Sequence, residues 1–372
     1  MKYSELLSST LMKRYPNPDM YPYRSWCYPQ GFMLWGMKML WEYTGDAKYY
    51  DYIILYADTH VDGNGNINKF KGNSMDDMQA GSVIAWAYGQ TGAKKYKKAC
   101  KTIRNAFNDY PRNSRGGFWH ERGKNEMWVD GVFMGQMFLA HYGYYIGEKE
   151  YCYGESAKQL AIICELCRKG NTGLILHAIA EHKDAEWADP VTGLSPEVWS
   201  EGLGWYALIL AEVLAVFDKN HPEREILITQ YKQLLESLKH HQDKHTGLWH
   251  QVVDKGDRPD NWHDTAGSAM FMYSIMKAVK MNIVSRLDYG ECIQKAYKGL
   301  VRKARLNDGN LVDIYDACDG LCVQESYDIY VNYIQKINAK EAVAAFLWAV
   351  TEYEWGYSKQ QSANDIDFLP SI

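Results

Sequence analysis

The sequence predicts an all-α protein whose helices close into an (α/α)6 barrel, a toroid of six helical hairpins, as one domain over residues 1–372. Three observations support this prediction. Near copies of one turn sequence recur, glycines precede the helices that lead into those turns, and strongly apolar helices alternate with amphipathic ones. No run has the two-residue period of a strand. An open solenoid of hairpins is the alternative arrangement.

The turn repeat marks the tips of the hairpins. Residues 44–49 (TGDAKY) and 91–96 (TGAKKY) are near copies, and residues 146–151 (IGEKEY) form a looser third copy. The glycine supplies the left-handed conformation that ends one helix, and the Lys and Tyr that follow open an amphipathic successor. Each copy therefore predicts one helix ending and another beginning.

The inner ring is predicted from helix starts that are rich in small residues. Gly31, Gly81 and Gly131 recur at equal intervals before the helices that lead into the tips. Similar starts follow later in the chain, at 202–204, 267–269 and 342–345. The helices are apolar on most sides, as in 83–88 and 132–141, which is typical of helices packed all round.

The outer ring is predicted from six amphipathic segments that alternate with the inner helices. They lie approximately at 2–14, 47–59, 93–108, 148–168, 223–241 and 286–304. In a toroid the long loops before inner helices gather at one mouth of the barrel. The longest of them are 109–129, 169–197 and 242–263, so the functional site is expected there.

Charge and hydropathy exclude several partners. The formal net charge is −5 and the charges are interspersed, so no basic face predicts a nucleic-acid partner. The densest basic stretch, 94–104, has the spacing of a solvated helix face. No apolar run approaches a membrane span, and residues 1–15 show no cleavable leader. We therefore expect a cytoplasmic protein with no membrane partner; the sequence does not indicate its oligomeric state.

Cysteine and aromatic content set weaker expectations. The eight cysteines are scattered, and the one CxxC pair, Cys164 and Cys167, lies inside a helix, which favours free thiols over zinc. Aromatic residues make up 14% of the chain, with 13 Trp and 29 Tyr. Such a number of rings is typical either of a sugar-stacking cleft or of a ring-rich helical core.

Two aspartates are the candidate catalytic residues. Asp77 in DMQAG and Asp130 in DGVFMG stand at the starts of successive inner helices. In a toroid such positions aim both carboxyl groups into one central pocket, where one carboxyl can keep the other protonated. Acidic residues also favour the first turn of any helix, and Asp76 is expected to have that ordinary capping role.

Histidines and tryptophans in the loops are candidate ligand contacts. Three times a glycine leads through apolar residues to a histidine, at His120, His177 and His250. The candidate sugar-stacking rings are Trp119, Trp199 and Trp205. Gly202 and Gly204, between the last two rings, would let a ligand approach the backbone. The spacing of these three histidines does not resemble HxxxH or HExxH on a helix, so we expect no catalytic metal and no cofactor.

Taken together, these segments resemble glycoside hydrolase family 105, and the resemblance spans nearly the whole chain in the same order. The motifs that carry it are WCYPQG at 26–31, DMQAG at 77–81, GGFWH at 116–120, MWVDG at 127–131, TGL…HA at 172–178, SPEVWSEGLGWY at 195–206 and TGLWHQVVDKGDRPDNW at 246–262. The combination of MWVDG with SPE…W…GW is more specific than any single motif.

The resemblance implies an (α/α)6 barrel that removes a 4,5-unsaturated galacturonyl residue from the non-reducing end of oligosaccharides left by rhamnogalacturonan (pectin) lyases. The reaction would hydrate an enol ether rather than use a glycosidic nucleophile. By position Asp130 matches the acid/base and Asp77 its partner carboxylate. The residues that match the lining of the unsaturated sugar site are Tyr28, His120, His177, Trp199 and Trp205.

Two departures from the family pattern leave the substrate open. Glu201 stands where many relatives carry an arginine between the two tryptophans, and Glu121 follows His120 where a basic residue is frequent. Arg122 or Lys124 could compensate. The alternatives are an unsaturated glucuronyl hydrolase, a carbohydrate-binding toroid without turnover, and a sugar epimerase that uses paired histidines as acid and base.

Overall fold

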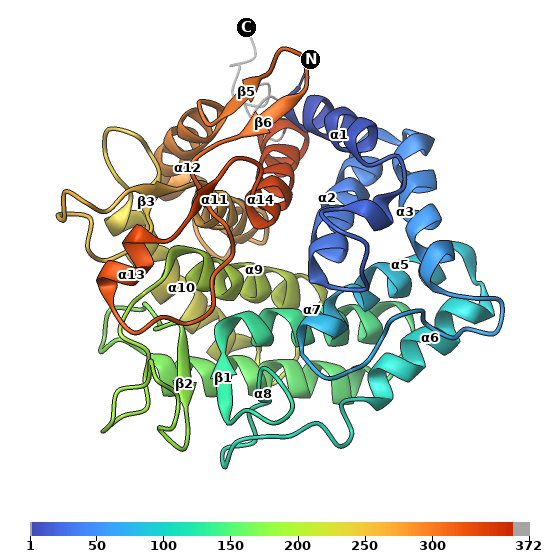
Figure 1. The fold of residues 1–372 in the computed structure, drawn as a ribbon, viewed down its shortest axis with the longest axis horizontal. Helices are drawn as coiled ribbons and strands as arrows, with labels where there is room; N and C mark the ends of the chain where they lie inside the picture. Colours follow the sequence, from blue (N-terminus) through green and yellow to red (C-terminus); the bar gives the residue numbers. More distant parts are fainter. Residues whose placement is uncertain (1, 360–372) are drawn as a thin grey trace, which may run out of the picture.

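Two concentric rings of helices make up the computed structural model, which describes residues 2–359 (Figure 1). The inner ring consists of α2 (Tyr28–Thr44), α5 (Gly81–Thr91), α7 (Val129–Tyr145), α9 (Ser200–Val216), α11 (Thr265–Lys280) and α14 (Lys340–Thr351). The outer ring consists of α1 (Tyr3–Arg14), α3 (Ala47–His60), α6 (Lys94–Asn105), α8 (Lys149–Cys167), α10 (Arg224–His241) and α12 (Arg286–Val301). Inner and outer helices alternate along the chain, as the sequence predicts.

The inner ring is closed. Each inner helix packs against the next one, and α14 returns to pack against α2. Rings from several inner helices meet on the axis, where Phe32 lies 4.8 Å from Trp205 and 4.9 Å from Trp348 between ring centroids. The prediction of an (α/α)6 barrel is therefore confirmed, and the open solenoid was wrong.

The hairpin tips close as the repeat predicts, with one variation. Gly45 and Gly92 end α2 and α5 in the left-handed conformation, at φ 68° and 66°. In the looser third copy, Gly147 has φ 142° and Glu148 has φ 59°. The third tip therefore places its left-handed residue one position later than the other two.

The glycines in the first turns of the inner helices allow close packing at the mouth of the barrel. A Cβ atom on Gly31 would lie 2.0 Å from Oε1 of Gln79, and one on Gly131 would lie 2.8 Å from Nδ1 of His120. Both distances are below any normal contact with a side chain. Glycine here lets a neighbouring loop or helix approach the helix backbone.

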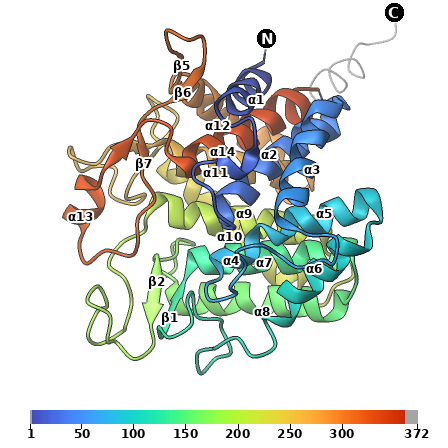
Figure 2. The ribbon, with the colours of Figure 1, turned by 45° about the vertical axis from the view of Figure 1, so that its right-hand side comes forward.

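Short sheets and turns organise the loops, and Figure 2 shows β1, β2, β7 and α13 on the same side of the helical ring. The antiparallel pairs are β1 (Glu126–Trp128) with β2 (Ala178–Ala180), β3 (Trp249–His250) with β4 (His263–Asp264), β5 (Ala304–Leu306) with β6 (Val312–Ile314), and β7 (Ala317–Cys318) with β8 (Gln335–Lys336). Strands of two or three residues are too short to leave a periodic pattern.

The remaining short elements are η1 (Pro18–Met20), α4 (Asp76–Gln79), α13 (Tyr327–Asn332) and η2 (Glu352–Tyr357). The two ends of the described chain are joined through Glu354, whose carboxylate accepts hydrogen bonds from the backbone amides of Tyr3 and Ser4 at 2.9 and 3.0 Å. This carboxylate pairs free N–H groups at the start of α1. None of the described helices combines the length and the apolar character that crossing a bilayer requires.

Candidate active site

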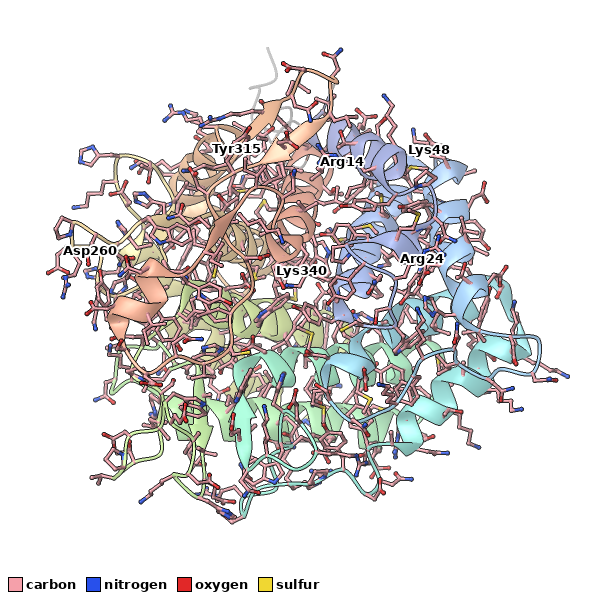
Figure 3. The ribbon with its side chains drawn as sticks, viewed as in Figure 1. Arg14, Arg24, Lys48, Asp260, Tyr315 and Lys340 are labelled. Atoms are coloured by element: carbon pink, nitrogen blue, oxygen red, sulfur yellow. The ribbon has the colours of Figure 1, made fainter. Side chains whose placement is uncertain are left out.

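A pocket of about 180 Å³ opens at the mouth of the barrel, and its walls come from segments spread over the whole chain. A cavity of about 150 Å³ holds a benzene ring, so the space suits one six-membered sugar ring. In Figure 3, Lys340 lies near the middle of the view, between the inner helices. The lining residues are Tyr28, Asp76, His120, Glu121, Lys124, Trp128, Asp130, Met134, Trp199, Glu201, Trp205, Gly320, Leu321, Cys322 and Lys340.

Asp130 enters the pocket from the first turn of α7 and is held by a histidine. Its Oδ2 lies 3.0 Å from Nε2 of His177, while Nδ1 of the same ring lies 2.9 Å from the hydroxyl of Tyr330. The His177 side chain is fully buried, whereas the Asp130 side chain keeps 14% of its surface exposed toward the pocket. His177 thus fixes one carboxyl oxygen of Asp130, and the carboxyl group remains accessible to a ligand in the pocket.

Asp76, and not Asp77, is the second aspartate in this pocket. Asp77 turns away, because its Oδ2 accepts a hydrogen bond from the backbone amide of Asn73 at 3.0 Å. Asp76 lines the pocket with Asp130. The predicted placement of these two neighbours is therefore reversed: Asp77 binds the preceding loop, and Asp76 faces the cavity.

The environment of Asp76 changes its acidity. Burial raises the pKa of Asp76 to about 6, with further contributions from the charges of Asp130 and Asp77, although His120 opposes the shift. His120 Nε2 lies 3.9 Å from Oδ1 of Asp76. A carboxyl group with this pKa exchanges its proton near neutral pH, which suits acid or base catalysis.

His120 forms one wall of the pocket together with Trp128. The two rings stack in parallel, with centroids 4.4 Å apart and an interplanar angle of 7°. The Trp128 indole N–H donates to Glu126 at 2.7 Å, which fixes the outer edge of the stack. The Gly131 backbone lies against the His120 ring from below. The wall is therefore rigid before any ligand arrives.

Tyr28, Trp199 and Trp205 belong to the lining, as predicted, although both indole side chains are almost fully buried, and Trp119 does not. The Trp205 ring packs edge-on against Tyr28 at 6.2 Å, and Trp199 lies 4.5 Å from His177, both between ring centroids. The Trp119 side chain is buried in the apolar core and is absent from the lining. The predicted ligand contact at Trp119 is therefore not supported by its position.

Gly202 and Gly204 serve protein packing rather than an approaching ligand. A Cβ atom on Gly202 would lie 3.1 Å from the Trp199 ring, and one on Gly204 would lie 2.4 Å from the sulfur of Met270. These contacts let α9 pack closely against its own N-terminal loop and against α11. The predicted reason for these glycines was wrong.

The floor of the pocket carries a buried group of charges at the starts of α9 and α14. Glu341 accepts hydrogen bonds from the Tyr28 hydroxyl and, at 2.6 Å, from the ammonium group of Lys340. Burial opposes the charge of Lys340, but the charge and the hydrogen bond of Glu341 outweigh it and raise the pKa of Lys340. Lys340 is therefore a stable cation in the pocket wall.

The two basic residues proposed to compensate for Glu201 and Glu121 have different positions. Lys124 lines the pocket, where its ammonium group lies 3.1 Å from Glu121. The Arg122 guanidinium is instead bound to Asp109 at 3.0 Å and to backbone carbonyl groups of the loops. Arg122 is a structural residue, so Lys124 and Lys340 are the lysines of the lining.

The third histidine of the glycine–histidine pattern lies elsewhere. His250 packs against His263 with ring centroids 4.2 Å apart, beside Gly256 and Asp243, in a separate hollow. The loop 242–263 contributes no residue to the lining of the pocket around Asp130. Of the three predicted loops, 109–129 lines the pocket and 169–197 supplies His177, which holds Asp130. The third, 242–263, supports the site through the pairing of Val252 with Trp199.

Sequence reasoning missed several residues of the site: Asp76, Trp128, Tyr330, Lys340 and the segment 320–322. Trp128 belongs to the MWVDG motif, so its neighbourhood to Asp130 was a usable signal. The segment before α14 has no glycine–histidine repeat, and nothing in its composition marks it. Only the closure of the ring brings the start of α14 to the same pocket as α2 and α9.

The comparisons with known proteins agree with this architecture. The model of Glycosyl Hydrolase Family 88 matches residues 3–356. The chain belongs to this family. It is also similar to a solved glycoside hydrolase of family 105 from C. acetobutylicum ATCC 824, with a TM-score of 0.89 and 30% identity over 95% of this chain and 99% of that one. The resemblance to family 105 is thereby confirmed.

Two curated relatives are similar to this chain at lower identity or over a shorter length. The unsaturated rhamnogalacturonyl hydrolase YesR of Bacillus subtilis (strain 168) is 21% identical over 285 residues, which cover 74% of this chain and 76% of the relative. Protein Atu3128 of Agrobacterium fabrum (strain C58 / ATCC 33970) is 29% identical over 151 residues, 41% of this chain. The match spans 63% of the length of Atu3128.

Proposed function

We propose that the protein is an unsaturated uronyl hydrolase that removes a 4,5-unsaturated galacturonyl residue from the non-reducing end of rhamnogalacturonan lyase products. The observation that carries this proposal is the Asp130 carboxyl group, open to an aromatic pocket and hydrogen-bonded to His177 at 3.0 Å. Membership of Glycosyl Hydrolase Family 88 and the similarity to YesR support it.

Asp130 donates the proton in the first step. The proton goes to C4 of the double bond, and the electron pair of that bond forms the new C–H bond, which leaves an oxocarbenium-like centre at C5. Water then adds its oxygen to C5 and returns a proton to the Asp130 carboxylate. The resulting hemiketal opens by breaking the bond between C5 and the ring oxygen, and the hemiacetal formed at C1 expels the aglycone.

His177 and Tyr330 let Asp130 act in both protonation states. When Asp130 carries the proton, it can donate to Nε2 of His177 while Nδ1–H donates to Tyr330. When Asp130 is ionised, Nε2–H can donate to it while the Tyr330 hydroxyl donates to Nδ1. The same three groups therefore hold the carboxyl oxygen before and after the proton has moved.

Asp76 and the rings complete the assignment. With a pKa of about 6, Asp76 can hold a negative charge beside the oxocarbenium-like centre at neutral pH. Tyr28 offers a partly exposed ring to the sugar, and the almost fully buried Trp199 and Trp205 support the pocket wall. Lys340 and Lys124 supply positive charge for the carboxylate of the uronate.

The test follows the ultraviolet absorbance of the conjugated C4=C5 bond in an unsaturated galacturonyl-rhamnose disaccharide. Loss of the absorbance with the wild-type protein, and none with an Asp130→Asn variant, is the expected result. An unsaturated glucuronyl disaccharide is measured alongside, because Glu121 and Glu201 make the pocket less basic than the family pattern. Because the C4=C5 bond removes the centre at which the two uronic acids differ, the faster substrate shows which linkage and aglycone the site accepts.

Two further outcomes would contradict the proposal. Binding of the disaccharide without any loss of absorbance would favour a carbohydrate-binding toroid. Full activity of Asp130→Asn on a sugar substrate would favour an epimerase with paired histidines. The predicted cytoplasmic location, the single domain over 1–372 and the absence of a cofactor stay predictions; residue 1 and residues 360–372 lie outside the described part of the chain.

A further inference from the structure

Glu201 is the one carboxyl group of the pocket lining that no described contact explains. Its side chain lies in the first turn of α9 with 1% of the residue exposed, and its Oε2 is buried without a hydrogen-bond partner. Within residues 2–359 no ion pair includes it. By contrast Glu121, Asp76 and Asp130 each lie near a lysine or a histidine.

An ionised carboxylate in this position would be strongly disfavoured. Burying an unpaired charge costs several kcal/mol, and like charges nearby add to the cost. The titratable and charged groups that act on Glu201 come from the elements around it: Glu341, Asp264, Lys340, Asp130, Tyr28 and Cys318. Lys340 is the cation among them, and Glu341 already binds it at 2.6 Å.

The electrostatic balance points in the same direction. Burial raises the pKa of Glu201 well above its ordinary range, and the charges of Glu341, Asp264 and Asp130 add to the shift while Lys340 opposes it. A protonated carboxyl group is a hydrogen-bond donor as well as an acceptor. Glu201 therefore brings an O–H donor to a pocket wall that it shares with Lys340.

We propose that Glu201 binds the substrate as an uncharged carboxylic acid and donates a hydrogen bond to the carboxylate of the bound uronate, next to Lys340. This inference rests on the proposed function, because it assigns a role to one residue of the same pocket. Glu201 then determines the preference for a sugar that carries a free carboxylate over a sugar in which that group is esterified. Its effect is on substrate binding, and the proton that it donates stays on Glu201.

The carboxylate is the group of the sugar that such a donor fits. The lining holds four carboxyl groups, at Asp76, Glu121, Asp130 and Glu201, against the two lysines Lys124 and Lys340. A bound uronate adds another negative charge, which a neutral Glu201 tolerates and an ionised Glu201 repels. A hydrogen bond from O–H to a carboxylate is also stronger than one to a hydroxyl group.

The first experiment uses the wild-type protein with the unsaturated uronyl disaccharide and with its methyl ester, over a range of pH. As Glu201 ionises, KM for the unesterified disaccharide is expected to rise by about tenfold per pH unit. The reason is that the substrate anion binds only to protein in which Glu201 is protonated. KM for the uncharged ester is expected to change by less than about threefold. Equal pH dependence of KM for both substrates would overturn the proposal.

The second experiment compares Glu201→Gln with Glu201→Ala. Glutamine keeps the shape and an uncharged donor, so kcat/KM is expected to stay within about threefold of the wild-type value and its KM to lose the pH dependence. Alanine removes the donor, and KM for the free acid is expected to rise by about 10- to 100-fold while kcat stays close to the wild-type value. An equal loss in both variants would mean that Glu201 acts as a carboxylate, which overturns the proposal.

The control variant is Glu212→Gln, on the same helix but at the other end of the barrel. Glu212 is equally buried and fully partnered, so its change is expected to leave the pH dependence of KM intact. If the wild-type protein does not consume the chromophore, the proposed function fails by itself. Calorimetric binding of the disaccharide to wild-type, Glu201→Gln and Glu201→Ala then tests Glu201, and absence of binding to the wild-type protein would overturn this inference too.

Discussion

The two ends of helix α9 carry buried glutamates that the protein treats in opposite ways. Glu201, at the mouth of the barrel, has an oxygen without any partner and a raised pKa. Glu212, at the closed end, accepts a hydrogen bond from the Tyr273 hydroxyl at 2.6 Å and lies 3.5 Å from His141 and 3.8 Å from Lys277. Although burial opposes its charge, Lys277, His141 and Tyr273 lower the pKa of Glu212.

The contrast between Glu201 and Glu212 reflects different roles of the two ends of the barrel: the mouth holds the candidate site, and the opposite end is stabilised by ion pairs. At the closed end acids and bases pair with each other, as Lys38 does with Glu42 at 2.8 Å and Lys280 with Glu352 at 3.1 Å. These pairs balance most of the charges around a pocket of about 170 Å³ at this end of the barrel. At the mouth the aspartates and Glu201 keep free hydrogen-bonding capacity, which costs stability unless a ligand completes it. The comparison predicts catalytic defects from mutations at one end and folding defects from mutations at the other.

The largest expected effect lies at the mouth. Asp130→Asn removes the proton that the reaction requires, so kcat is expected to fall by about 1,000-fold or more on a substrate that the wild-type protein cleaves. The fold should persist, because asparagine can still contact His177. The decay of ultraviolet absorbance measures the rate and circular dichroism the fold. A variant with normal turnover would remove Asp130 from the mechanism.

The next effect separates the two neighbouring aspartates. Asp76→Asn is expected to lower kcat by about 100-fold, because an uncharged amide cannot hold a negative charge beside the oxocarbenium-like centre. Asp77→Asn is expected to keep kcat within about threefold and to lower the free energy of unfolding by about 1 kcal/mol, since it weakens a cap on a loop amide. Rates and denaturant unfolding of both variants, measured side by side, check the assignment. The opposite pattern would restore Asp77 as the partner of Asp130.

The acidity of Asp76 adds a dependence on pH. Its pKa of about 6 exceeds the unfolded value of about 3.9, so its contribution to stability is present below pH 4 and is lost as the pH rises toward 6. Asp76→Asn should therefore flatten the stability profile between these two values. Unfolding measured at several pH values checks the sign. A wild-type profile that gains stability over this interval through Asp76 would contradict it.

These aspartates also show how far the sequence leads. The turn repeat and the small residues at helix starts predict the closed ring, because both signals are local. They also predict the positions of Asp130 and His177. Adjacent residues on a helix point about 100° apart, however, so a one-residue error at a helix start exchanges a pocket residue for a structural one. The break between α4 and α5, after Gln79, makes the direction of Asp76 harder to predict.

Site residues from distant segments could not be predicted from the sequence for a different reason. Tyr330 contacts His177 across 153 residues of sequence, and Lys340 reaches the pocket only because α14 closes the ring against α2. Neither residue belongs to a repeated motif. The charge state of Glu201 is equally a property of packing, because it follows from burial and from charged neighbours on α7, β4 and α14 rather than from its own helix.

A smaller effect compares the two ends of α9 through stability. Glu212→Gln leaves Lys277 and His141 without their acid, and the free energy of unfolding at pH 7 is expected to fall by about 3 kcal/mol. The lowered pKa of Glu212 gives stability above the unfolded value of about 4.3, which the wild-type protein loses as the pH falls. Glu212→Gln should show less of this acid-side loss.

Glu201→Gln should behave in the opposite way in the same experiment. A raised pKa gives stability at low pH that is lost as the pH rises, so removal of the acid is expected to stabilise the protein at pH 7 by on the order of 2 kcal/mol. Thermal or denaturant unfolding of the matched pair checks both signs. Destabilisation by both variants would abolish the contrast between the two ends.

The smallest expected effect concerns the exposed cation at the rim of the mouth. Lys124 keeps 52% of its side chain exposed and lies 3.1 Å from Glu121, so water and salt screen its charge. Lys124→Gln is expected to raise KM by about threefold at low ionic strength and to leave kcat unchanged. Lys340, with 18% of its side chain exposed, should matter more and depend less on salt. Steady-state kinetics of Lys124→Gln and Lys340→Gln at two salt concentrations measure the ratio, and a larger loss at Lys124 would place the uronate carboxylate at the rim instead of beside Glu201.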